Sequence, residues 1–344
     1  SGKGFTEWTN VAQTMPLYKG HEQPKIPTEL GFYDLRLPDA RKAQAELAKE
    51  HGIEGFAYWH YWFGGKRILE KPFNEVLSSG EPDFPFCLAW ANHTWTGVWV
   101  GLSDKILIEQ TYPGVEDHIN HFNNVLPAFK DKRYIRVENK PLFYIYNPNE
   151  IPNYQEMISL WNSLAKENGL EGIYFVGPSG YPDLEGDQLL KHGFNAIHSF
   201  RFEESFSKMK GHSISQRIIR KIQRTLKLSK KVGLNIYDYN EFITNFISDS
   251  DSKENLFPTL YPSWDNTARR GKNALILENS SPDNFKTHVK RVLDVIKKKP
   301  LDKRIIFLKS WNEWAEGNYM EPDMKYGRKY LEILKSELEN LKTH

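Results

Sequence analysis

The sequence predicts an α/β protein built as a (β/α)8 barrel of the TIM type, and three observations lead to this fold class. Short apolar runs alternate along the chain with amphipathic, charged segments, which is the pattern of βα units around a parallel sheet. The length of 344 residues suits one such barrel. The hydrophobic fraction of 39% supplies enough apolar side chains for a large core. We therefore expect residues 1–344 to form a single domain.

Seven strands can be counted from the apolar runs, and they are expected at 55–59, 84–91, 141–146, 172–176, 194–199, 256–261 and 304–310. Helices are expected at 37–51, 154–168 and 325–342. A closed eight-stranded barrel needs one more strand. Because the first clear element after an irregular N-terminal stretch is a helix, we expect the first strand to be missing from this chain. The alternative is an open or irregular barrel of seven strands.

One segment interrupts the alternation of strands and helices. Between Ser207 and Val232 there are nine lysines and arginines and no acid, interleaved with isoleucine and leucine side chains. This pattern predicts an amphipathic basic helix, in an insertion around 203–250 that follows the strand expected at 194–199, which would be the sixth strand of an eight-stranded barrel. The helix either presents a solvated outer face or contacts an anionic glycan or a membrane surface that carries lipid-linked sugar.

Composition excludes several classes of partner. Lysine and arginine number 46 against 44 acidic residues, so no nucleic-acid partner is expected. The only cysteine, Cys87, lies in an apolar run, which rules out a disulfide framework and a cysteine zinc site and predicts a core side chain. No apolar stretch approaches the roughly 18 residues that span a bilayer. The chain does not open with a signal-peptide pattern, and the compartment is left open.

Cofactor and metal motifs are also lacking from the sequence. No Gly-x-Gly-x-x-Gly or Gly-Lys-Ser/Thr pattern occurs, which argues against nicotinamide and ATP chemistry. No His-Glu-x-x-His pattern supports a zinc site. Asp249-Ser250-Asp251 resembles the Asp-x-Asp metal site of many glycosyltransferases, but its Ser/Asp-rich surroundings favour a plain polar turn. We therefore expect neither a cofactor nor a metal.

The residues that follow the last predicted strand are the strongest candidates for catalysis. In barrel enzymes the catalytic residues lie at the carboxyl ends of the strands and in the loops after them. Positions 311–321 contain three carboxylates and three large aromatic side chains. Glycoside cleavage requires two carboxyl groups beside the scissile bond, which Glu313 and Glu316 could supply. Neighbouring tryptophans would raise the pKa of one of them by desolvation. The alternative is two surface glutamates in a loop.

Aromatic side chains beside asparagine and histidine recur at other strand ends, and they predict a sugar pocket. Aromatic rings stack on the apolar faces of sugars, while amides and imidazoles bind hydroxyl groups. At least three of Trp62, Trp90, Trp95, Trp264 and Trp314 should line one cleft. The full set of candidate substrate-binding residues is Tyr58, His60, Trp62, Trp90, Asn92, His93, Trp95, Tyr146, Trp264, Asn266, Trp311, Asn312 and Trp314.

Several motifs together resemble the WbsX-like family of bacterial polysaccharide-locus proteins. They are the stretches 3–8 (KGFTEW), 31–36 (GFYDLR), 61–67 (YWFGGKR), 90–92 (WAN) and 311–317 (WNEWAEG), so the resemblance covers nearly the whole chain. The family is related to glycoside hydrolase family 99, the endo-α-mannosidases, which use a (β/α)8 barrel. Their catalytic segment is similar to Asn-Glu-Trp-His-Glu-Gly, and this chain has Ala315 in place of the histidine. It also has His93 and Thr94 where the family pattern has Glu and Asn.

The resemblance implies a retaining mechanism without a covalent glycosyl-enzyme ester. Glu313 would deprotonate the sugar 2-hydroxyl, which attacks the anomeric carbon, and Glu316 would act first as the acid and then as the base for water. The leading hypothesis is thus an endo-α-mannosidase-like hydrolase that acts on a surface or complex polysaccharide. One alternative is a glycosyltransferase of lipopolysaccharide, O-antigen or capsule biosynthesis. The other is a non-catalytic barrel that binds glycans.

Overall fold

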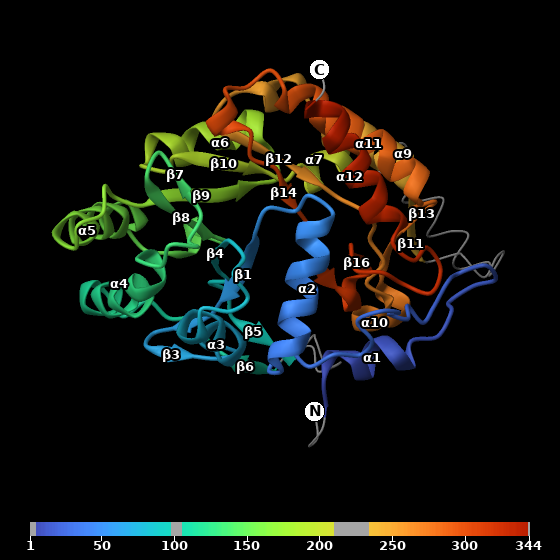
Figure 1. The fold of residues 1–344 in the computed structure, drawn as a ribbon, viewed down its shortest axis with the longest axis horizontal. Coiled ribbons are helices and arrows are strands. Elements are labelled where there is room, and N and C mark those ends of the chain that lie inside the picture. The colour runs from blue at the N-terminus through green and yellow to red at the C-terminus, as the bar shows by residue number, and fades with distance from the viewer. Residues whose placement is uncertain (1–4, 98–104, 210–233, 343–344) are drawn as a thin grey trace.

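Seven parallel strands form the centre of the protein and curl into a half-barrel (Figure 1). The computed structural model describes residues 5–97, 105–209 and 234–342. The seven strands are hydrogen-bonded in chain order, and the first and the last of them are not paired with each other within the described residues. They are β1 (Phe56–His60), β4 (Phe86–Trp90), β8 (Lys140–Ile145), β9 (Tyr174–Ser179), β10 (Ala196–Ser199), β12 (Leu256–Leu260) and β14 (Phe307–Leu308). Each of the seven predicted strands is confirmed, although β14 is much shorter than expected.

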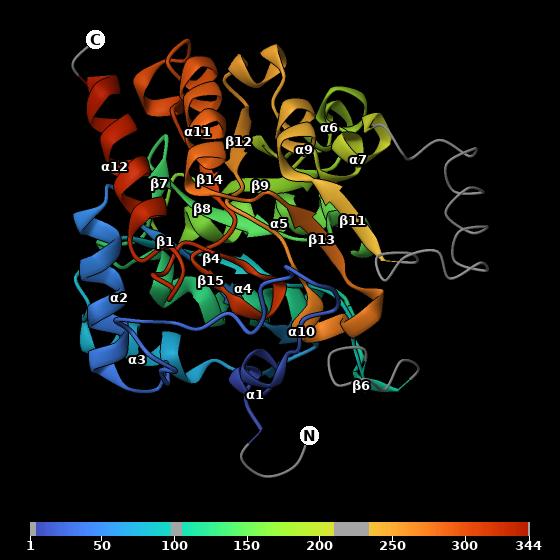
Figure 2. The ribbon, with the colours of Figure 1, turned by 90° about the vertical axis from the view of Figure 1, so that its right-hand side faces the viewer.

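Helices cover the outside of the strands (Figures 1 and 2). The three predicted helices are present as α2 (Pro38–Glu50), α5 (Tyr154–Glu167) and α12 (Lys329–Lys342). The others are α1 (Glu7–Gln13), α3 (Lys71–Ser79), α4 (Val115–Phe129), α6 (Pro182–Lys191), α7 (Phe202–Lys208), α9 (Tyr239–Phe246), α10 (Thr267–Arg270) and α11 (Pro282–Ile296). Short 3-10 turns occur at η2 (Pro148–Glu150), η3 (Asp249–Ser252), η4 (Gly271–Asn273), η5 (Leu301–Lys303) and η6 (Trp314–Glu316).

The helix α11 illustrates how the sequence produces this layer. The Ser281 side chain accepts a hydrogen bond from the Asn284 amide and caps the first turn, where Pro282 needs no amide partner. Apolar side chains at Phe285 and Val289, and at further positions three or four residues apart, form one buried face. That face packs against the buried residues of α9 and β12. Burial of this stripe holds α11 in the outer layer.

Several short strands lie outside the half-barrel. β11 (Asn235–Asp238) and β13 (Leu275–Glu278) form a small parallel pair that the sequence analysis did not predict. Three antiparallel hairpins join β2 (Trp62–Phe63) to β3 (Lys66–Arg67), β5 (Trp95–Thr96) to β6 (Ile106–Ile108), and β15 (Asn312–Glu313) to β16 (Asn318–Tyr319). β7 (Arg136–Val137) pairs antiparallel with β8. The basic segment predicted between Ser207 and Val232 lies almost entirely outside the described residues.

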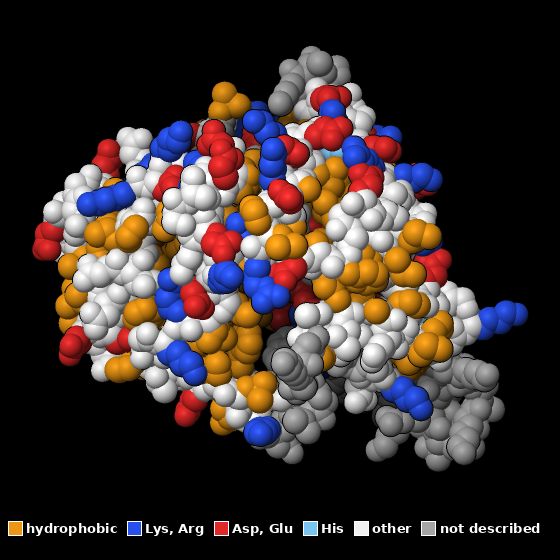
Figure 3. All heavy atoms as spheres, turned by 60° about the horizontal axis from the view of Figure 1, so that its bottom comes forward, with side chains coloured by type: hydrophobic (Ala, Val, Ile, Leu, Met, Phe, Trp, Pro, Cys, Tyr) orange, Lys and Arg blue, Asp and Glu red, His pale blue; other side chains and the backbone are white. Residues whose placement is uncertain are grey.

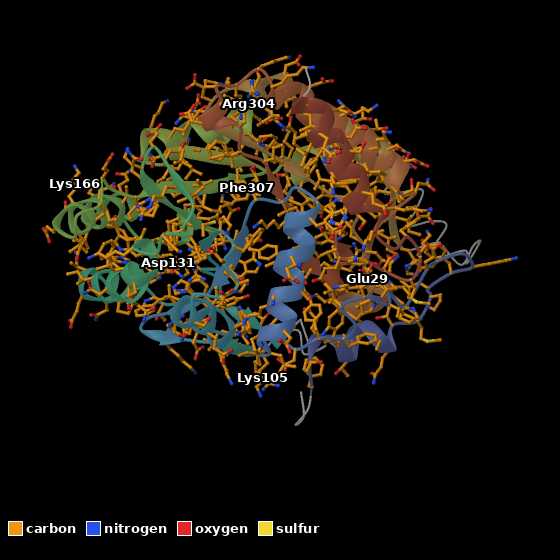
Figure 4. All side chains as sticks on the ribbon, viewed as in Figure 1. Glu29, Lys105, Asp131, Lys166, Arg304 and Phe307 are labelled. Atoms are coloured by element: carbon orange, nitrogen blue, oxygen red, sulfur yellow. The ribbon has the colours of Figure 1, made fainter. Side chains whose placement is uncertain are left out.

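The register of the strands decides which side chains face the inside of the half-barrel. Trp59 lies opposite Ala89, which lies opposite Tyr144, so these three side chains share one face of the sheet. The Tyr144 ring lies 6.4 Å from Trp59 and 5.7 Å from Phe307. In Figure 4, Phe307 lies near the middle of the ribbon and Lys166 at its outer edge. The row from Trp59 to Phe307 is therefore the inner face.

Charges of both signs are interspersed over the face shown in Figure 3, with apolar side chains between them. No extended single-sign surface of the kind that binds nucleic acid is visible on this face. Within the described residues, no helix is long and apolar enough to cross a membrane.

Candidate active site

The two predicted catalytic glutamates lie in a tight hairpin directly after β14. Glu313 ends β15, Glu316 ends the turn η6, and β16 returns antiparallel to β15. Gly317 closes the turn with a positive φ of 57°, and a Cβ atom at this position would lie 2.7 Å from the Asp265 carbonyl oxygen. Only glycine combines this backbone conformation with so close an approach. The hairpin is thereby held against the loop after β12.

One arginine joins the two glutamates. Arg269 Nη2 lies 2.6 Å from Glu313 Oε1, and Arg269 Nη1 lies 2.6 Å from Glu316 Oε1. Because both nitrogens belong to one planar guanidinium, the two carboxylates are held within a few ångströms of each other. Their side chains keep 22% and 14% of their exposure, so water and ligands can reach them.

Asp265 positions both Arg269 and Glu316. Its carboxylate accepts hydrogen bonds from the Thr267 amide at 3.1 Å and from the Thr267 hydroxyl at 2.5 Å, which fixes the start of α10 and hence Arg269. Its other oxygen lies 2.9 Å from His21 Nε2. The Asp265 amide donates to the Glu316 carbonyl at 2.8 Å. One buried aspartate thus connects the N-terminal segment, α10 and the hairpin that contains both glutamates.

The electrostatics of the site favour a protonated Glu313 near neutral pH. Burial, and then the charge of Glu316, raise the pKa of Glu313 to about 8, against the opposing charge of Arg269. At pH 7 Glu313 therefore binds a proton, while Glu316 has two cations beside it.

The second cation is Lys309, which sequence reasoning missed. Its Nζ lies 3.4 Å from Glu316 Oε2 and 5.2 Å from the centre of the Trp264 ring. Lys309 directly follows β14, and its amide donates to the Leu260 carbonyl at 3.0 Å. A lysine at the end of an apolar strand is itself a signal, because lysine is rarely buried without a partner.

The third carboxylate of the segment, Glu321, has a structural role. It is buried and accepts hydrogen bonds from Trp314 Nε1 at 2.6 Å, from Gln44 at 2.6 Å and from the Tyr33 hydroxyl at 2.9 Å. Burial raises the pKa of Glu321 to about 7 in spite of these donors. Tyr33 in turn accepts a hydrogen bond from Asn312 at 3.0 Å. Glu321 therefore anchors Trp314 and, through Tyr33, Asn312.

Exposed or half-buried aromatic side chains lie at the ends of β1, β4 and β8. Trp59 is 45% exposed and Tyr146 41% exposed, with ring centres 5.7 Å apart. The His93 ring lies 5.6 Å from Tyr146, and Trp95 lies 5.1 Å from Tyr61. His93, Trp95 and Tyr146 were predicted, whereas Trp59 and Tyr61 were not.

The expectation that at least three of five tryptophans line one cleft is wrong. Trp62, Trp90 and Trp314 are buried, at 5%, 1% and 3% exposure, while Trp95 and Trp264 are half-buried. Trp62 Nε1 donates to the Asp117 carboxylate, and Trp90 Nε1 donates to the Trp62 carbonyl. Rings with these partners and this burial have no face left for a sugar.

Tyr58 and His60 point away from the inner face. Because side chains alternate along β1, they lie on the side opposite Trp59. Tyr58 packs 5.4 Å from Phe73 of α3, and His60 Nε2 lies 2.8 Å from His121 Nε2 of α4. Burial lowers the pKa of His60 to about 3, so it is neutral. Both side chains belong to the packing between strands and helices.

Three more predicted residues support the local structure. Asn92 is fully buried and exchanges two hydrogen bonds of 2.7 Å with the Asn147 backbone, which joins the loops after β4 and β8. Asn266 accepts a hydrogen bond from the Leu275 amide at 2.8 Å. Trp311 packs 5.4 Å from Phe56 of β1, across the unpaired edges of the half-barrel.

The Asp-x-Asp sequence at 249–251 forms a structural turn, as the sequence analysis favoured. Asp251 is fully buried, accepts a hydrogen bond from Ser199 at 2.5 Å and pairs with Arg201 at 3.2 Å. Within the described ranges, no cluster of three or more His, Cys, Asp or Glu side chains could hold a metal ion.

The sequence as a whole matches a known family. The family model described as glycosyltransferase WbsX matches residues 1–334. The chain belongs to the WbsX family. Two relatives, each an uncharacterized protein WxcX from Xanthomonas campestris pv. campestris (strains B100 and ATCC 33913), are 31% identical to this WbsX-family chain over 338 residues. The match covers 98% of this chain and 46% of theirs, so the chain spans less than half the length of these relatives.

Solved structures share the fold of this WbsX-family protein. A glycoside hydrolase-like protein superposes with a TM-score of 0.61 at 17% identity, covering 92% of this chain and 89% of that one. The GH99 endo-α-mannosidase from Bacteroides thetaiotaomicron superposes with a TM-score of 0.58 at 13% identity, covering 96% and 92%. At this identity the likeness establishes the fold. The half-barrel thus shares the TIM-barrel fold of these structures.

Proposed function

We propose that this WbsX-family protein is a retaining α-glycoside hydrolase, similar to an endo-α-mannosidase, that cleaves a surface or complex polysaccharide. The observation that carries the proposal is the pair Glu313 and Glu316, bound to one guanidinium at the carboxyl end of β14. The raised pKa of Glu313 supports it, because the site then holds a proton near neutral pH. Exposed Trp59 and Tyr146 are suited to stack on sugar rings.

In the first step, Glu313 takes the proton of the sugar 2-hydroxyl while its oxygen attacks the anomeric carbon. The bond to the leaving oxygen breaks, and Glu316 donates a proton to that oxygen. In the second step, Glu316 takes a proton from water, water attacks the anomeric carbon, and Glu313 returns its proton to the 2-oxygen. Retention of configuration follows from the two inversions. The pair carries one proton at the start and at the end.

The free protein places that proton on Glu313, whereas the first step requires it on Glu316. A bound 2-hydroxyl resolves this difference, because a hydrogen bond donated to a carboxylate favours its ionised form. The bound sugar thus favours the ionised Glu313 that the first step requires.

The test begins with a screen of polysaccharides and oligosaccharides for released reducing ends, with Glu316→Gln as the blank. Glu316→Gln should then lose on the order of 10²–10⁴ in rate on the natural glycan but much less on an activated aryl glycoside, which needs no acid. Glu313→Gln should slow both substrates comparably. Circular dichroism checks that both variants remain folded. Full activity in either variant would remove the pair from the mechanism.

A second candidate function is glycosyl transfer, which the description of the family model favours. A transferase would bind a nucleotide sugar, and calorimetry with nucleotide sugars tests this directly. If aromatic substitutions weakened glycan binding while neither glutamate variant changed turnover of any substrate, the protein would instead be a glycan-binding barrel.

A further inference from the structure

The Arg269 guanidinium holds a third carboxylate, Glu7, in addition to the catalytic pair. Arg269 Nε donates to Glu7 Oε1 at 3.0 Å, and Nη2 also donates to this oxygen. The same Nη2 donates to Glu313 at 2.6 Å, while Nη1 donates to Glu316. Because the donors of a guanidinium form a rigid fork, Arg269 cannot move toward one carboxylate without moving away from another. Glu7 and Glu313 therefore share one nitrogen and its charge.

Glu7 reaches the site from a helix outside the half-barrel. It lies in the first turn of α1, and α1 packs against η6 and α10. The Trp8 ring lies 5.5 Å from Trp314, and Val11 is buried in one cluster with Trp314 and Ala315. The Glu7 side chain is 48% exposed, against 22% for Glu313. The docked helix thus brings a half-exposed carboxylate to a largely buried arginine.

We propose that Glu7 is a positioning residue for the catalytic pair: it fixes Arg269 among three carboxylates and so sets how much of the arginine charge reaches Glu313. Glu7 acts through Arg269. The inference rests on the proposed function, since positioning has a meaning for catalysis only if Glu313 and Glu316 perform it. The linkage between Glu7 and Glu313 can nevertheless be measured without any substrate.

Charged groups on four elements face Glu313. Glu316 of η6 and Glu7 of α1 raise its pKa, whereas Arg269 of α10 and Lys309 after β14 lower it. Among the described residues, the Tyr61 hydroxyl, after β1, is a further titratable neighbour. Its pKa is raised by burial first and by the charge of Glu313 second, so Tyr61 stays neutral.

The sign of the effect of Glu7→Gln follows from these contacts. The change removes one negative charge that holds the Glu313 pKa up. It also weakens the contact that competes for Arg269 Nη2, so this nitrogen can bind Glu313 more strongly. Both consequences favour the ionised form of Glu313, so its pKa falls and Glu313 loses its proton at lower pH.

The experiment is a pH titration of the glutamate side-chain carboxyl carbons by NMR, on the full chain labelled with ¹³C-glutamate. The Glu313 signal is assigned by its disappearance in Glu313→Gln. We expect its midpoint to fall by on the order of one pH unit in Glu7→Gln. Glu116→Gln makes the same change in the first turn of α4 and should leave the midpoint where it is. Glu7→Asp keeps the charge on a shorter side chain, so its Glu313 midpoint should lie between those of the parent and of Glu7→Gln.

An unchanged Glu313 midpoint in Glu7→Gln would overturn the inference, even if activity fell, because that combination describes a purely structural role. If the midpoint falls, the high-pH limb of the activity profile should move down with it. If the midpoint falls but the protein hydrolyses no glycan, the result contradicts the proposed function and still supports the linkage between Glu7 and Glu313.

Discussion

Replacing Arg269 with methionine tests whether this arginine holds the site together. Methionine keeps much of the length of the side chain but leaves Glu7, Glu313 and Glu316 without their shared cation. Removing one partner of a fully buried ion pair costs about 3–5 kcal/mol. Because the carboxylates are partly exposed and water screens them, we expect a loss of about 2–3 kcal/mol. With an unfolding entropy of about 0.7 kcal/mol/K for 344 residues, the melting temperature should fall by about 3–4 °C at pH 7.

The loss should depend on pH in a defined direction. Arg269 lowers the pKa of Glu313, so its contribution is present when Glu313 is ionised and fades as Glu313 takes up a proton. Since that pKa is about 8, the difference between parent and variant should widen from pH 7 to pH 9.

Calorimetric melting at pH 6 to 9 measures this difference. The control is Arg291→Met, because Arg291 donates to the main-chain carbonyls of Ile243 and Thr244, which do not titrate. The fall in melting temperature that this change causes should be the same from pH 6 to pH 9. A variant of Arg269 that melts with the parent at every pH would refute the view that this arginine compensates the three carboxylates.

The remaining predictions concern the rim and the hairpin. Trp59→Ala should weaken glycan binding roughly tenfold in calorimetry with little change in melting temperature, because the ring is 45% exposed; equal binding would remove Trp59 from the sugar site. Gly317→Ala should lower both activity and melting temperature, whereas Gly327→Ala should affect stability only slightly. Both glycines have a positive φ, but only at Gly317 would the new Cβ meet the Asp265 backbone, and similar effects of the two changes would contradict this reasoning.

The strands were predictable because parallel strands buried on both faces read as continuous apolar runs. The same continuous apolar pattern does not indicate which face of each strand points toward the inside of the half-barrel. Positions 56–62 read FAYWHYW, with an aromatic ring or imidazole at six of seven positions, so no alternation indicates which side chains point inward. The aromatic pattern predicted Tyr58, His60 and Trp62 as sugar-binding residues, while the structure places Trp59 on the inner face beside Tyr144. Pairing with β4 and β8 decides this, and pairing is a tertiary contact.

By itself, the sequence determined that the chain forms a parallel α/β fold. It also determined that two glutamates three residues apart follow the last strand, at the mouth of the barrel. Those features depend on composition and on neighbours along the chain. Only the tertiary structure decided which groups surround the glutamates. Arg269 is 44 residues from Glu313 in the chain, and Glu7 is 262 residues from Arg269. The charge and burial that set the pKa of Glu313 arise from packing between distant segments, and no local pattern in the sequence encodes such packing.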